Sequence, residues 1–380
     1  MSLLRTRPAT TPAMLAVFDD AATIAHALAF EVALARAEAA EGLIAADVAD
    51  AIVAACAGLA IGPAALAEEA ALAGTLAIPL VTRLRVATAG DAADAVHRGA
   101  TSQDVADTVL MLQIRRAAPL LAAEVDRVCT GLYAIAERHA ATLAIGRTLL
   151  QDAMPIGFGL RFAQAAAGID DAGRRLNQEI TSNAKIQLGG AAGTRAGLGG
   201  KGADIARRMA DALGLAPGEP WHARRVGIAA IASALGMLIG ALGKFARDVS
   251  LLAQNGVGEA REPLVVGRDG SSAMAHKRNP TGCQVALSAA LRAPGLVASI
   301  LAGLPAEEER GLGGWQAEGP VLTDLFLLAA GSAQAMAAVA EGLEIDEAAI
   351  ARNVAAADVG TNIGESAAIV AALLDHHRKG

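Results

Sequence analysis

Aromatic side chains are scarce in this sequence, because phenylalanine, tryptophan and tyrosine together make up only 2% of its 380 residues. The chain is nevertheless 54% hydrophobic, since alanine and leucine supply the excess. Runs in which β-branched and polar residues alternate are also few. This composition favours helices and argues against a β-sandwich.

Clusters of like charge are absent and cysteines are few. The formal net charge is −7 with no basic block, so the chain lacks an electrostatic footprint for nucleic acid. Cys56, Cys129 and Cys283 lack the spacing of metal ligands or of a disulfide framework, which fits buried thiols in a reducing compartment. The first residues do not form a secretory signal. We therefore expect a cytoplasmic protein without a nucleic-acid partner.

One uncharged segment, residues 226–243, has the length of a possible membrane span. It is rich in alanine and glycine, however, and Arg225 and Lys244 flank it. A helix that is apolar on all sides is also expected where it is buried inside a bundle. We expect no membrane partner, and the mean hydropathy of +0.41 predicts helices that are buried between subunits as well as within one.

Glycine and proline divide the chain into expected helices, several of them long. Two are expected within 13–60, and others over 104–116, 119–140, 158–183, 201–213, 221–254, 284–301, 321–341 and 347–353. The segment 146–155 is expected to be a loop or a broken turn. Because long helices must lie side by side, the sequence predicts an all-α chain built on a central bundle.

Two polar, glycine-marked breaks between these helices contain candidate site residues. In 97–104, Thr101 and Ser102 precede a helix, where hydroxyl and backbone N–H groups can bind an anion. The alternative there is simple N-capping, with Asp104 in the first turn. In 146–155, Arg147 and Asp152 could equally form only a surface ion pair.

A third break, residues 270–280, reads Gly-Ser-Ser-Ala-Met-Ala-His-Lys-Arg-Asn-Pro. Its terminal glycine and proline indicate a loop. Lys277 and Asn279 are good donors to carboxylate or phosphate, and the Ser271 hydroxyl beside fixed cations loses its proton more readily. This pattern predicts an anion site with a candidate base or nucleophile, and the alternative is a solvated linker.

Together the three segments resemble the signature regions of the fumarase/aspartase superfamily, whose Gly-Ser-Ser-x-x-Met-Pro-x-Lys-x-Asn-Pro loop is similar to residues 270–280. Within the superfamily the sequence is most similar to the 3-carboxy-cis,cis-muconate cycloisomerases, with supporting segments at 99–105, 187–194, 220–225 and 309–318. The last two of these segments resemble the cycloisomerases more than the lyases of purine or arginine metabolism. The resemblance implies a homotetramer with a central bundle of long helices, active sites shared between subunits, and neither a metal nor an organic cofactor. It also implies an N-terminal helical domain (1–100), a central bundle domain with the signature loops (101–344) and a short C-terminal helical domain (345–380).

The activity that this resemblance implies is lactonisation of 3-carboxy-cis,cis-muconate to 4-carboxymuconolactone, a step of aromatic degradation, through an aci-carboxylate intermediate. Alternatives are a cycloisomerase for 3-sulfomuconate, a superfamily lyase of the adenylosuccinate or argininosuccinate type, and an inactive structural protein on the same bundle.

The resemblance also implies residue roles. Ser271 would transfer the proton at carbon, and Lys277 would stabilise the carboxylate that carries the developing charge. Other residues would bind the substrate's carboxylates or support the site: Thr101, Ser102, Gln103, Asn279, Arg310, Arg147 and His276. Relatives usually have a histidine where Asp152 stands, and many have a tryptophan at Leu149 and a proline at Ala275. Asp152 is therefore expected to take part in the acid–base chemistry in place of that histidine.

Overall fold

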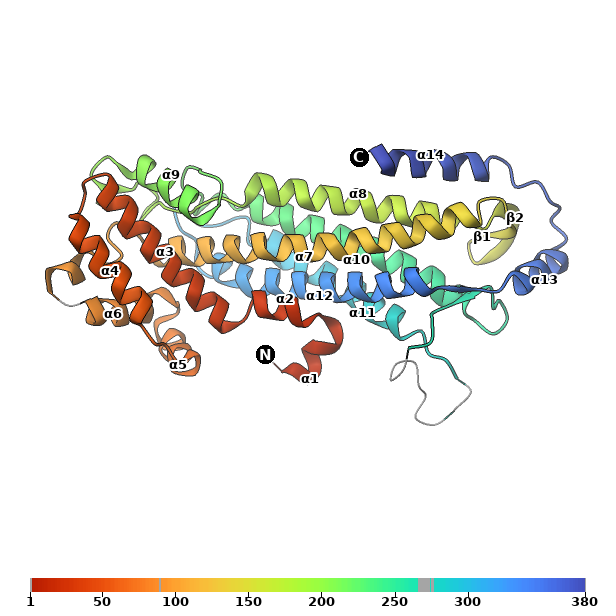
Figure 1. Cartoon of the computed structure of the whole chain (residues 1–380), viewed down its shortest axis with the longest axis horizontal. Helices are drawn as coiled ribbons and strands as arrows, with labels where there is room; N and C mark the ends of the chain where they lie inside the picture. The colour runs from red at the N-terminus through yellow and green to blue at the C-terminus, as the bar shows by residue number, and fades with distance from the viewer. Residues whose placement is uncertain (1, 89, 266–273, 275–276, 380) are drawn as a thin grey trace.

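The computed structural model describes residues 2–88, 90–265, 274 and 277–379. Long helices lie side by side along the longest axis of this described part (Figure 1). They are α7 (Ser102–Arg138), α8 (Leu160–Asn183), α10 (Val226–Leu252), α11 (Thr281–Ala302) and α12 (Gly314–Gly342). The predicted central bundle of long helices is confirmed.

Helix α7 is one continuous helix of 37 residues, although the sequence predicted two helices separated at Pro119. Proline removes one backbone N–H and usually bends or ends a helix. Pro119 and Arg115, whose carbonyl loses its partner, both lie on the exposed side of α7, where water can solvate that carbonyl. The opposite side keeps Ile114 and Leu121 in the core, so packing holds the helix together through the proline.

Shorter helices gather at the end of the bundle where α7 begins (Figure 1). In chain order the elements of this group are α3 (Asp20–Ala40), α4 (Ala46–Gly58), α5 (Pro63–Ala73), α6 (Ala77–Thr88), η2 (Gly90–Ala95), η3 (Ala196–Leu198) and α9 (Gly202–Leu213). The first elements of the chain, α1 (Leu3–Thr6), η1 (Arg7–Ala9) and α2 (Pro12–Val17), lie instead beside the middle of the bundle, where α2 contacts α7 and α12. Helix α3 contacts α4, α7 and α9, and Asp19 caps it by accepting a hydrogen bond from the Ala22 N–H at 2.7 Å. Helix α3 therefore links this group to the bundle.

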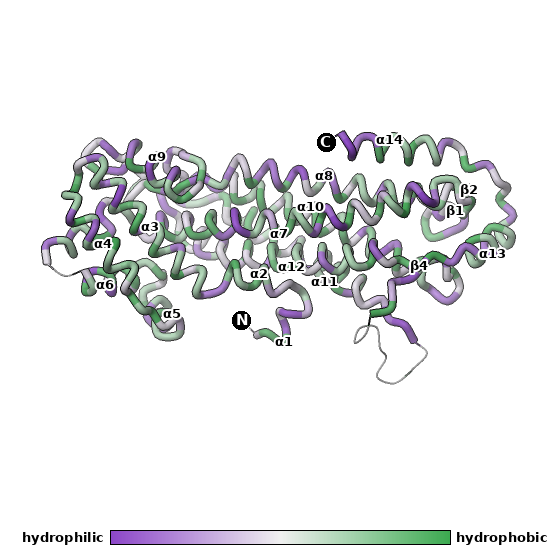
Figure 2. The backbone as a smooth tube through the Cα atoms, in the orientation of Figure 1, coloured by the Kyte–Doolittle hydropathy of each residue, from purple (hydrophilic) through white to green (hydrophobic). Residues whose placement is uncertain are grey.

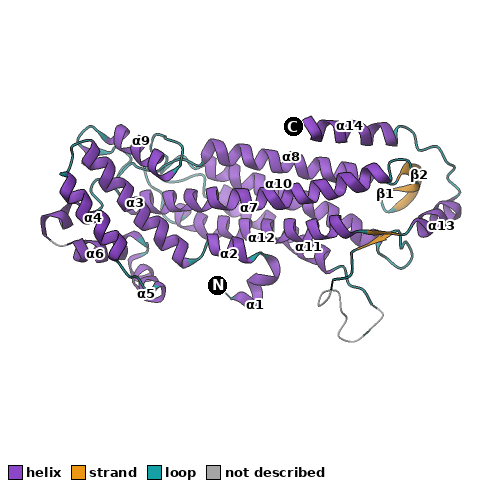
Figure 3. Cartoon of the chain, viewed as in Figure 1, coloured by secondary structure: helices purple, strands orange, loops and turns teal. Residues whose placement is uncertain are grey.

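The expectation of an all-α chain needs one correction, because short strands occur (Figure 3). β1 (Leu143–Thr148) and β2 (Gln151–Gly157) form an antiparallel hairpin, and β3 (Ala260–Arg261) pairs with β4 (Glu344–Ile345). The hairpin occupies the segment predicted to be a loop. Its two turn residues, Leu149 and Leu150, have φ angles of 52° and 64°, which suit the tight turn but are uncommon for leucine.

The last two helices, α13 (Glu347–Ala357) and α14 (Ser366–Lys379), follow β4. Helix α14 contacts α8 and α7, and its His377 ring stacks on Tyr133 of α7 with centroids 4.5 Å apart. The His377 Nδ1 also lies 2.9 Å from an Asp170 oxygen. The division into domains at 100/101 and 344/345 stays a prediction.

Hydrophobic residues occur along all the long helices of the bundle (Figure 2). All three cysteines are buried, as predicted. By length and composition alone, α10, α11 and α12 could each cross a membrane, as could the stretch from α2 through α3. Of the most apolar 18 residues in each helix, 72% are buried in α12 but only 22% in α11. Leu291 on α11 and Val226 on α10 are 83% and 71% exposed, so an apolar side of the bundle remains uncovered in the single chain.

Candidate functional site

The predicted site residues lie at two opposite ends of the bundle. Thr101 immediately precedes α7, whereas Arg147 lies in β1, just after α7 ends. A helix of 37 residues is about 55 Å long at 1.5 Å per residue. We call these two regions the Thr101 end and the Arg147 end. Within one chain they are too far apart to contact the same small molecule.

At the Thr101 end, Arg310 reaches the residue that caps α7. The Arg310 Nη1 donates to the Thr101 Oγ1 at 2.6 Å. Thr101 has an extended backbone and the residues after it are helical, so N–H groups of the first turn point outward beside a fixed guanidinium. A helix N-terminus and an arginine both favour negative charge. Thr101 and Arg310, which the resemblance assigned to carboxylate binding, are therefore brought together.

Asp104 fixes this N-terminus from behind. Its carboxylate accepts from the Thr101 N–H at 2.9 Å, which is the capping interaction considered from the sequence. It also accepts from the Gly189 and Gly190 N–H groups at 2.8 and 3.0 Å. Gly190 has a φ of 70°, and a Cβ there would lie 2.7 Å from the Gly99 carbonyl oxygen. The glycine-rich segment 187–194 is thereby held against the Thr101 loop.

Gln103, a predicted substrate ligand, is fully buried beside Asp104. Its amide nitrogen donates to the His222 carbonyl at 3.2 Å. Ser102 is the first residue of α7 and is partly exposed. The hydroxyl of Ser102 is thus better placed than the Gln103 amide to meet a ligand from outside.

A buried ion cluster, which sequence reasoning missed, joins three of the long helices. Arg225 precedes α10 and donates to both Asp107 oxygens of α7 at 2.8 Å, and its Nε donates to Glu318 of α12 at 3.0 Å. Burial alone would lower the pKa of Arg225. The hydrogen bonds and negative charges of Asp107 and Glu318 have the larger effect, so the pKa of Arg225 is raised. Burial is also the main cause that raises the pKa of Glu318. Resemblance marked the segments of Arg225 and Glu318, but nothing in the sequence indicated that they pair.

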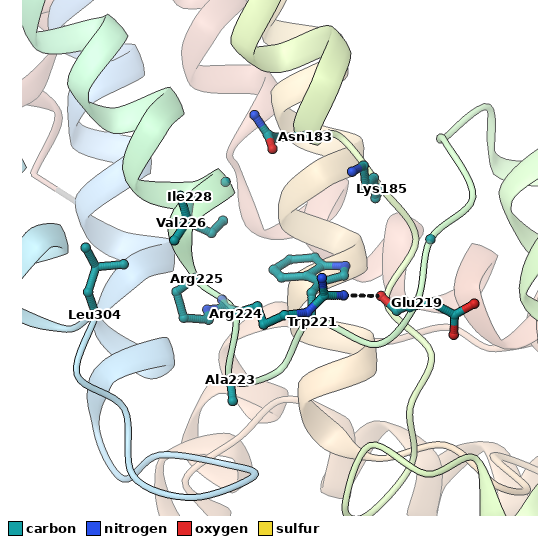
Figure 4. Close-up of a pocket in the computed structure, with 12 residues that line it drawn as sticks. Asn183, Lys185, Glu219, Trp221, Ala223, Arg224, Arg225, Val226, Ile228 and Leu304 are labelled. Atoms are coloured by element: carbon teal, nitrogen blue, oxygen red, sulfur yellow. Dashed lines mark hydrogen bonds between the residues drawn. The ribbon is translucent and has the colours of Figure 1, made fainter.

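A cavity of about 710 Å³ opens beside this cluster. Figure 4 shows the residues that line it. Trp221 and Arg225 line it together, and the Arg225 guanidinium lies 4.6 Å from the centre of the Trp221 ring. Lys185 and Arg224 add positive charge, and Arg224 donates to the Glu219 carbonyl at 3.3 Å. The described lining contains none of the residues predicted for the site.

At the Arg147 end, Arg147 connects the β1–β2 hairpin to the residue that precedes β3. It donates to both oxygens of the fully buried Glu259 at 3.0 and 2.6 Å, and its Nε donates to Asp152 at 3.1 Å. Burial opposes ionisation of Glu259, but hydrogen bonds from Arg147 and Asn353 and the charge of Arg161 bring its pKa below the ordinary value. The hydrogen bond to Glu259 is the main cause that raises the pKa of Arg147. Arg147 is thus primarily tied to Glu259, which sequence reasoning missed.

The Asp152 side chain is 51% exposed and faces a cavity of about 840 Å³. Arg147, Leu149 and Arg161 also line this cavity. A carboxylate at such a position is accessible to a ligand or to another copy of the chain, whereas Glu259 is not.

The described residues of the signature loop also lie at the Arg147 end. Arg278 donates to Glu344 of β4 at 2.9 Å, and β4 pairs with β3 next to Glu259. Glu262 accepts from the N–H groups of Gly282 and Cys283 at 2.9 and 2.6 Å at the start of α11. This anchoring places Lys277, which is exposed, and Asn279 just before α11. Ser271 and His276 lie outside the described residues.

A single chain therefore brings Thr101, Ser102, Gln103 and Arg310 together at one end. Arg147, Asp152, Lys277 and Asn279 lie at the other. Among the residues that the structure describes, no group of three or more His, Cys, Asp or Glu side chains is arranged to hold a metal ion.

A protein-family model described as "Lyase" matches residues 6–295 of this chain. The 3-carboxy-cis,cis-muconate cycloisomerase of Bradyrhizobium diazoefficiens is 46% identical over 348 residues, which cover 90% of this chain and 77% of that protein. The enzyme of the same name from Pseudomonas aeruginosa is 45% identical over 90% of this chain and 75% of that protein. A nitrosuccinate lyase of Streptomyces davaonensis is 39% identical over 89% and 73%.

A solved structure shows the same fold. The crystal structure of 3-carboxy-cis,cis-muconate lactonizing enzyme from Pseudomonas putida superposes with a TM-score of 0.86 at 41% sequence identity. The match covers 93% of this chain and 79% of that one. Similarity in sequence and in structure therefore extends over both ends of the bundle.

Proposed function

Because the chain belongs to the fumarase/aspartase superfamily, we propose that it is the member that lactonises 3-carboxy-cis,cis-muconate to 4-carboxymuconolactone. The observation that carries this proposal is 46% identity to a 3-carboxy-cis,cis-muconate cycloisomerase over 90% of the chain. The enzyme is an isomerase, an intramolecular lyase of muconate that acts in aromatic degradation.

The reaction adds a carboxylate oxygen of the substrate across a C=C bond of the same molecule. Electrons move to the carbon next to another carboxylate, which then carries two negative charges as an aci-carboxylate. Protonation of that carbon completes the lactone. The difficult step is stabilising the doubly charged carboxylate, and fixed donors in a site without water do this best. The reaction needs no redox step, and we propose that the enzyme is cofactor-free.

The Thr101 end is suited to hold one substrate carboxylate. Thr101 and Ser102 offer hydroxyl groups at a helix N-terminus, and Arg310 lies 2.6 Å from the Thr101 hydroxyl. Gln103 is buried and would support the first turn of α7 through its hydrogen bond to the His222 carbonyl. Because a guanidinium can bind a carboxylate through two hydrogen bonds, Arg310 would also fix the orientation of the substrate.

The Arg147 end and the signature loop would supply the charge stabilisation and the proton. Lys277 and Asn279 would bind the carboxylate that becomes the aci-carboxylate, and Ser271 would carry the proton to carbon. Asp152 would exchange the proton with solvent or with Ser271, while Arg147 orients Asp152 through the 3.1 Å contact. We propose only a positional role for His276.

These assignments require more than one subunit. The length of α7, about 55 Å, separates the Thr101 end from the Arg147 end within a chain. The uncovered apolar side chains of α10 and α11 support burial against other copies. We propose a cytoplasmic homotetramer in which each active site combines the Thr101 end of one subunit with hairpin and signature-loop residues of others.

The direct test is an absorbance assay of the purified chain with 3-carboxy-cis,cis-muconate, in which turnover removes the conjugated chromophore. Adenylosuccinate, argininosuccinate and nitrosuccinate serve as lyase comparisons, and 3-sulfomuconate tests the other cycloisomerase substrate. We expect turnover of 3-carboxymuconate with the highest kcat/KM. Retention of the chromophore over hours at high enzyme concentration would refute the proposed function.

The assignment of the proton carrier has its own test. Ser271→Ala is expected to lower kcat about 100- to 10,000-fold, as loss of a general acid–base group does. Arg207→Ala is the matched control, because Arg207 pairs only with Asp204 on the exposed side of α9 among the described residues. If Ser271→Ala keeps nearly full kcat, Ser271 is not the proton carrier.

A further inference from the structure

His222 lies where the first turn of α7 meets two segments from much later in the chain. The Gln103 amide donates to its backbone carbonyl at 3.2 Å, and its Nε2 lies 2.8 Å from the Asp104 Oδ1. Consecutive side chains of α7 therefore bind the same residue, one through the backbone and one through the imidazole. The His222 side chain is 2% exposed and that of Asp104 is 0% exposed, so this contact is shielded from water.

Hydrogen bonds and close packing also hold the residues around His222 in place. The Trp221 N–H, next to His222, donates to the Gln187 Oε1 at 2.9 Å, and the Gln187 amide donates to Asp107 at 3.0 Å. Asp104 and Asp107 lie three residues apart on one side of α7, so both carboxylates hold the segments 187–190 and 221–225. Gly189 packs directly on the imidazole, because a Cβ at Gly189 would lie 2.6 Å from the His222 Cε1.

The contacts of Asp104 determine which imidazole nitrogen carries the hydrogen. Both carboxylate oxygens already accept backbone N–H groups, from Gly189 on one oxygen and from Thr101 and Gly190 on the other. A carboxylate has no hydrogen to donate, so the His222 Nε2 must be the donor in this pair. Loss of that donor would leave a buried carboxylate with one charge-assisted hydrogen bond fewer.

The other nitrogen, Nδ1, is buried and has no hydrogen-bond partner among the described residues. The His222 ring also borders a cavity of about 130 Å³, together with Trp315 and with Glu307 and Gly311, which flank the loop of Arg310. The imidazole thus lies between the Asp104 carboxylate and the segment that supplies Arg310. A shift of the His222 ring would therefore displace both Thr101, through Asp104, and the loop that contains Arg310.

We propose that His222 is a positioning residue for the reaction: through its Nε2–H it holds the Asp104 carboxylate, and Asp104 holds the Thr101 N-terminus in the geometry that binds the substrate carboxylate. This inference rests on the proposed function, in which Thr101 and Arg310 bind one carboxylate of the muconate. His222 does not contact the substrate.

Three substitutions separate the hydrogen bond from the space that the ring fills. In His222→Gln the side-chain amide nitrogen can reach the place of Nε2, whereas in His222→Asn it takes the place of Nδ1 and cannot reach Asp104. His222→Phe keeps an aromatic ring, slightly larger than imidazole, without either nitrogen. We expect His222→Phe and His222→Asn to lower kcat/KM for 3-carboxymuconate about 10- to 100-fold, mainly through KM. His222→Gln should stay within about threefold of wild type.

A readout independent of turnover is hydrogen–deuterium exchange followed by mass spectrometry on the same variants. His222→Phe and His222→Asn should speed exchange about 10-fold in peptides covering 99–104 and 187–194, while peptides from α10 and α12 exchange as in wild type. His222→Gln should restore protection. Unchanged exchange in these peptides in His222→Phe, or equal losses in His222→Gln and His222→Phe, would overturn the positioning role. If the wild-type protein fails to convert 3-carboxymuconate, the proposed function fails, and the exchange pattern still decides whether His222 holds the Thr101 loop.

Discussion

Glu38 illustrates at the residue scale how burial alone can set a charge state. Its side chain is fully buried in α3, and both carboxylate oxygens lack a hydrogen-bond partner in the described part of the chain. Burial raises the pKa of Glu38 from 4.5 to about 8, Arg98 opposes the shift, and Glu31 adds to it. Glu38 is therefore protonated in the folded protein near neutral pH, whereas it is ionised in the unfolded chain.

This difference gives a pH dependence with a definite sign. Because the folded pKa lies above the unfolded value, the folded state binds more protons, and stability must fall as the pH rises from 4.5 to about 8. The slope from this residue is at most about 1.4 kcal/mol per pH unit. Glu38→Gln, which keeps the shape without the charge, should remove this slope. Urea unfolding of both proteins from pH 5 to 9 checks it, and parallel curves for the two proteins would contradict the assignment.

Single residues were predictable from the sequence where their role is local or where the resemblance covered them. Thr101 could be recognised as a helix cap, and Arg310 as a candidate clamp from the motif around it. Glu259 could not be found, because it is 112 positions from Arg147 and no periodic pattern connects the two. The pairing of His222 with Asp104 could not be found either, because the two residues are 118 positions apart.

At the scale of elements, the buried Arg225 cluster determines how α7, α10 and α12 are joined. Arg225→Ala would leave the Asp107 carboxylate buried without its cation, which costs about 3–5 kcal/mol of unfolding free energy. Glu318→Gln should cost less, about 1–2 kcal/mol, because Asp107 still accepts two hydrogen bonds from Arg225 and the amide oxygen can still accept one. Chemical denaturation of the two variants measures both values. Equal losses would show that the Glu318 charge is needed as much as that of Arg225.

The β1–β2 hairpin keeps strained, exposed leucines at its turn. Leu149 and Leu150 have positive φ angles and are 92% and 80% exposed, so neither packing nor turn preference explains them in the single chain. The double substitution Leu149→Asn with Leu150→Gly should stabilise the fold by about 1 kcal/mol, because an Asn-Gly pair favours the turn. The same double variant should lower kcat/KM for 3-carboxymuconate, since the tip lies between Arg147 and Asp152. Thermal unfolding and the absorbance assay check the two parts, and higher stability with full turnover would mean that the leucines have no role in the reaction.

The errors in predicting elements have the same physical origin. The hairpin was expected to be a loop because Leu149-Leu150 lacks the Asn-Gly or Gly-rich signal of a two-residue turn. The break at Pro119 was expected because local preference disfavours proline inside a helix. At Pro119 the packed side of α7 outweighs local preference. At the hairpin the pairing of β1 with β2 and the hydrogen bonds of Arg147 to Glu259 hold the strands around a turn that its own residues do not favour. The bundle itself follows from long apolar helices that have no other way to bury their surface.

At the scale of the whole molecule, the length of α7 connects fold and function. The residues that we propose for one reaction are separated by a helix about 55 Å long, so the proposed site requires parts from more than one chain. Two inactive variants should then complement each other only when their substitutions lie at opposite ends. Arg310→Ala removes the guanidinium at the Thr101 end, and Lys277→Ala removes the cation at the Arg147 end.

Co-expression of Arg310→Ala and Lys277→Ala chains with different affinity tags yields mixed assemblies that can be purified on both tags. If random mixing supplies each end of a site from a different subunit, about one quarter of the sites contain both native residues, and activity should return to about a quarter of wild type. The matched control pairs Arg310→Ala with Thr101→Val. These two residues contact each other within one chain at 2.6 Å, so every mixed site lacks one of them and activity should stay low. Equal activity in the two mixtures would contradict sites shared between subunits, and restoration in the first mixture alone would establish that the two ends of the bundle meet only across the assembly.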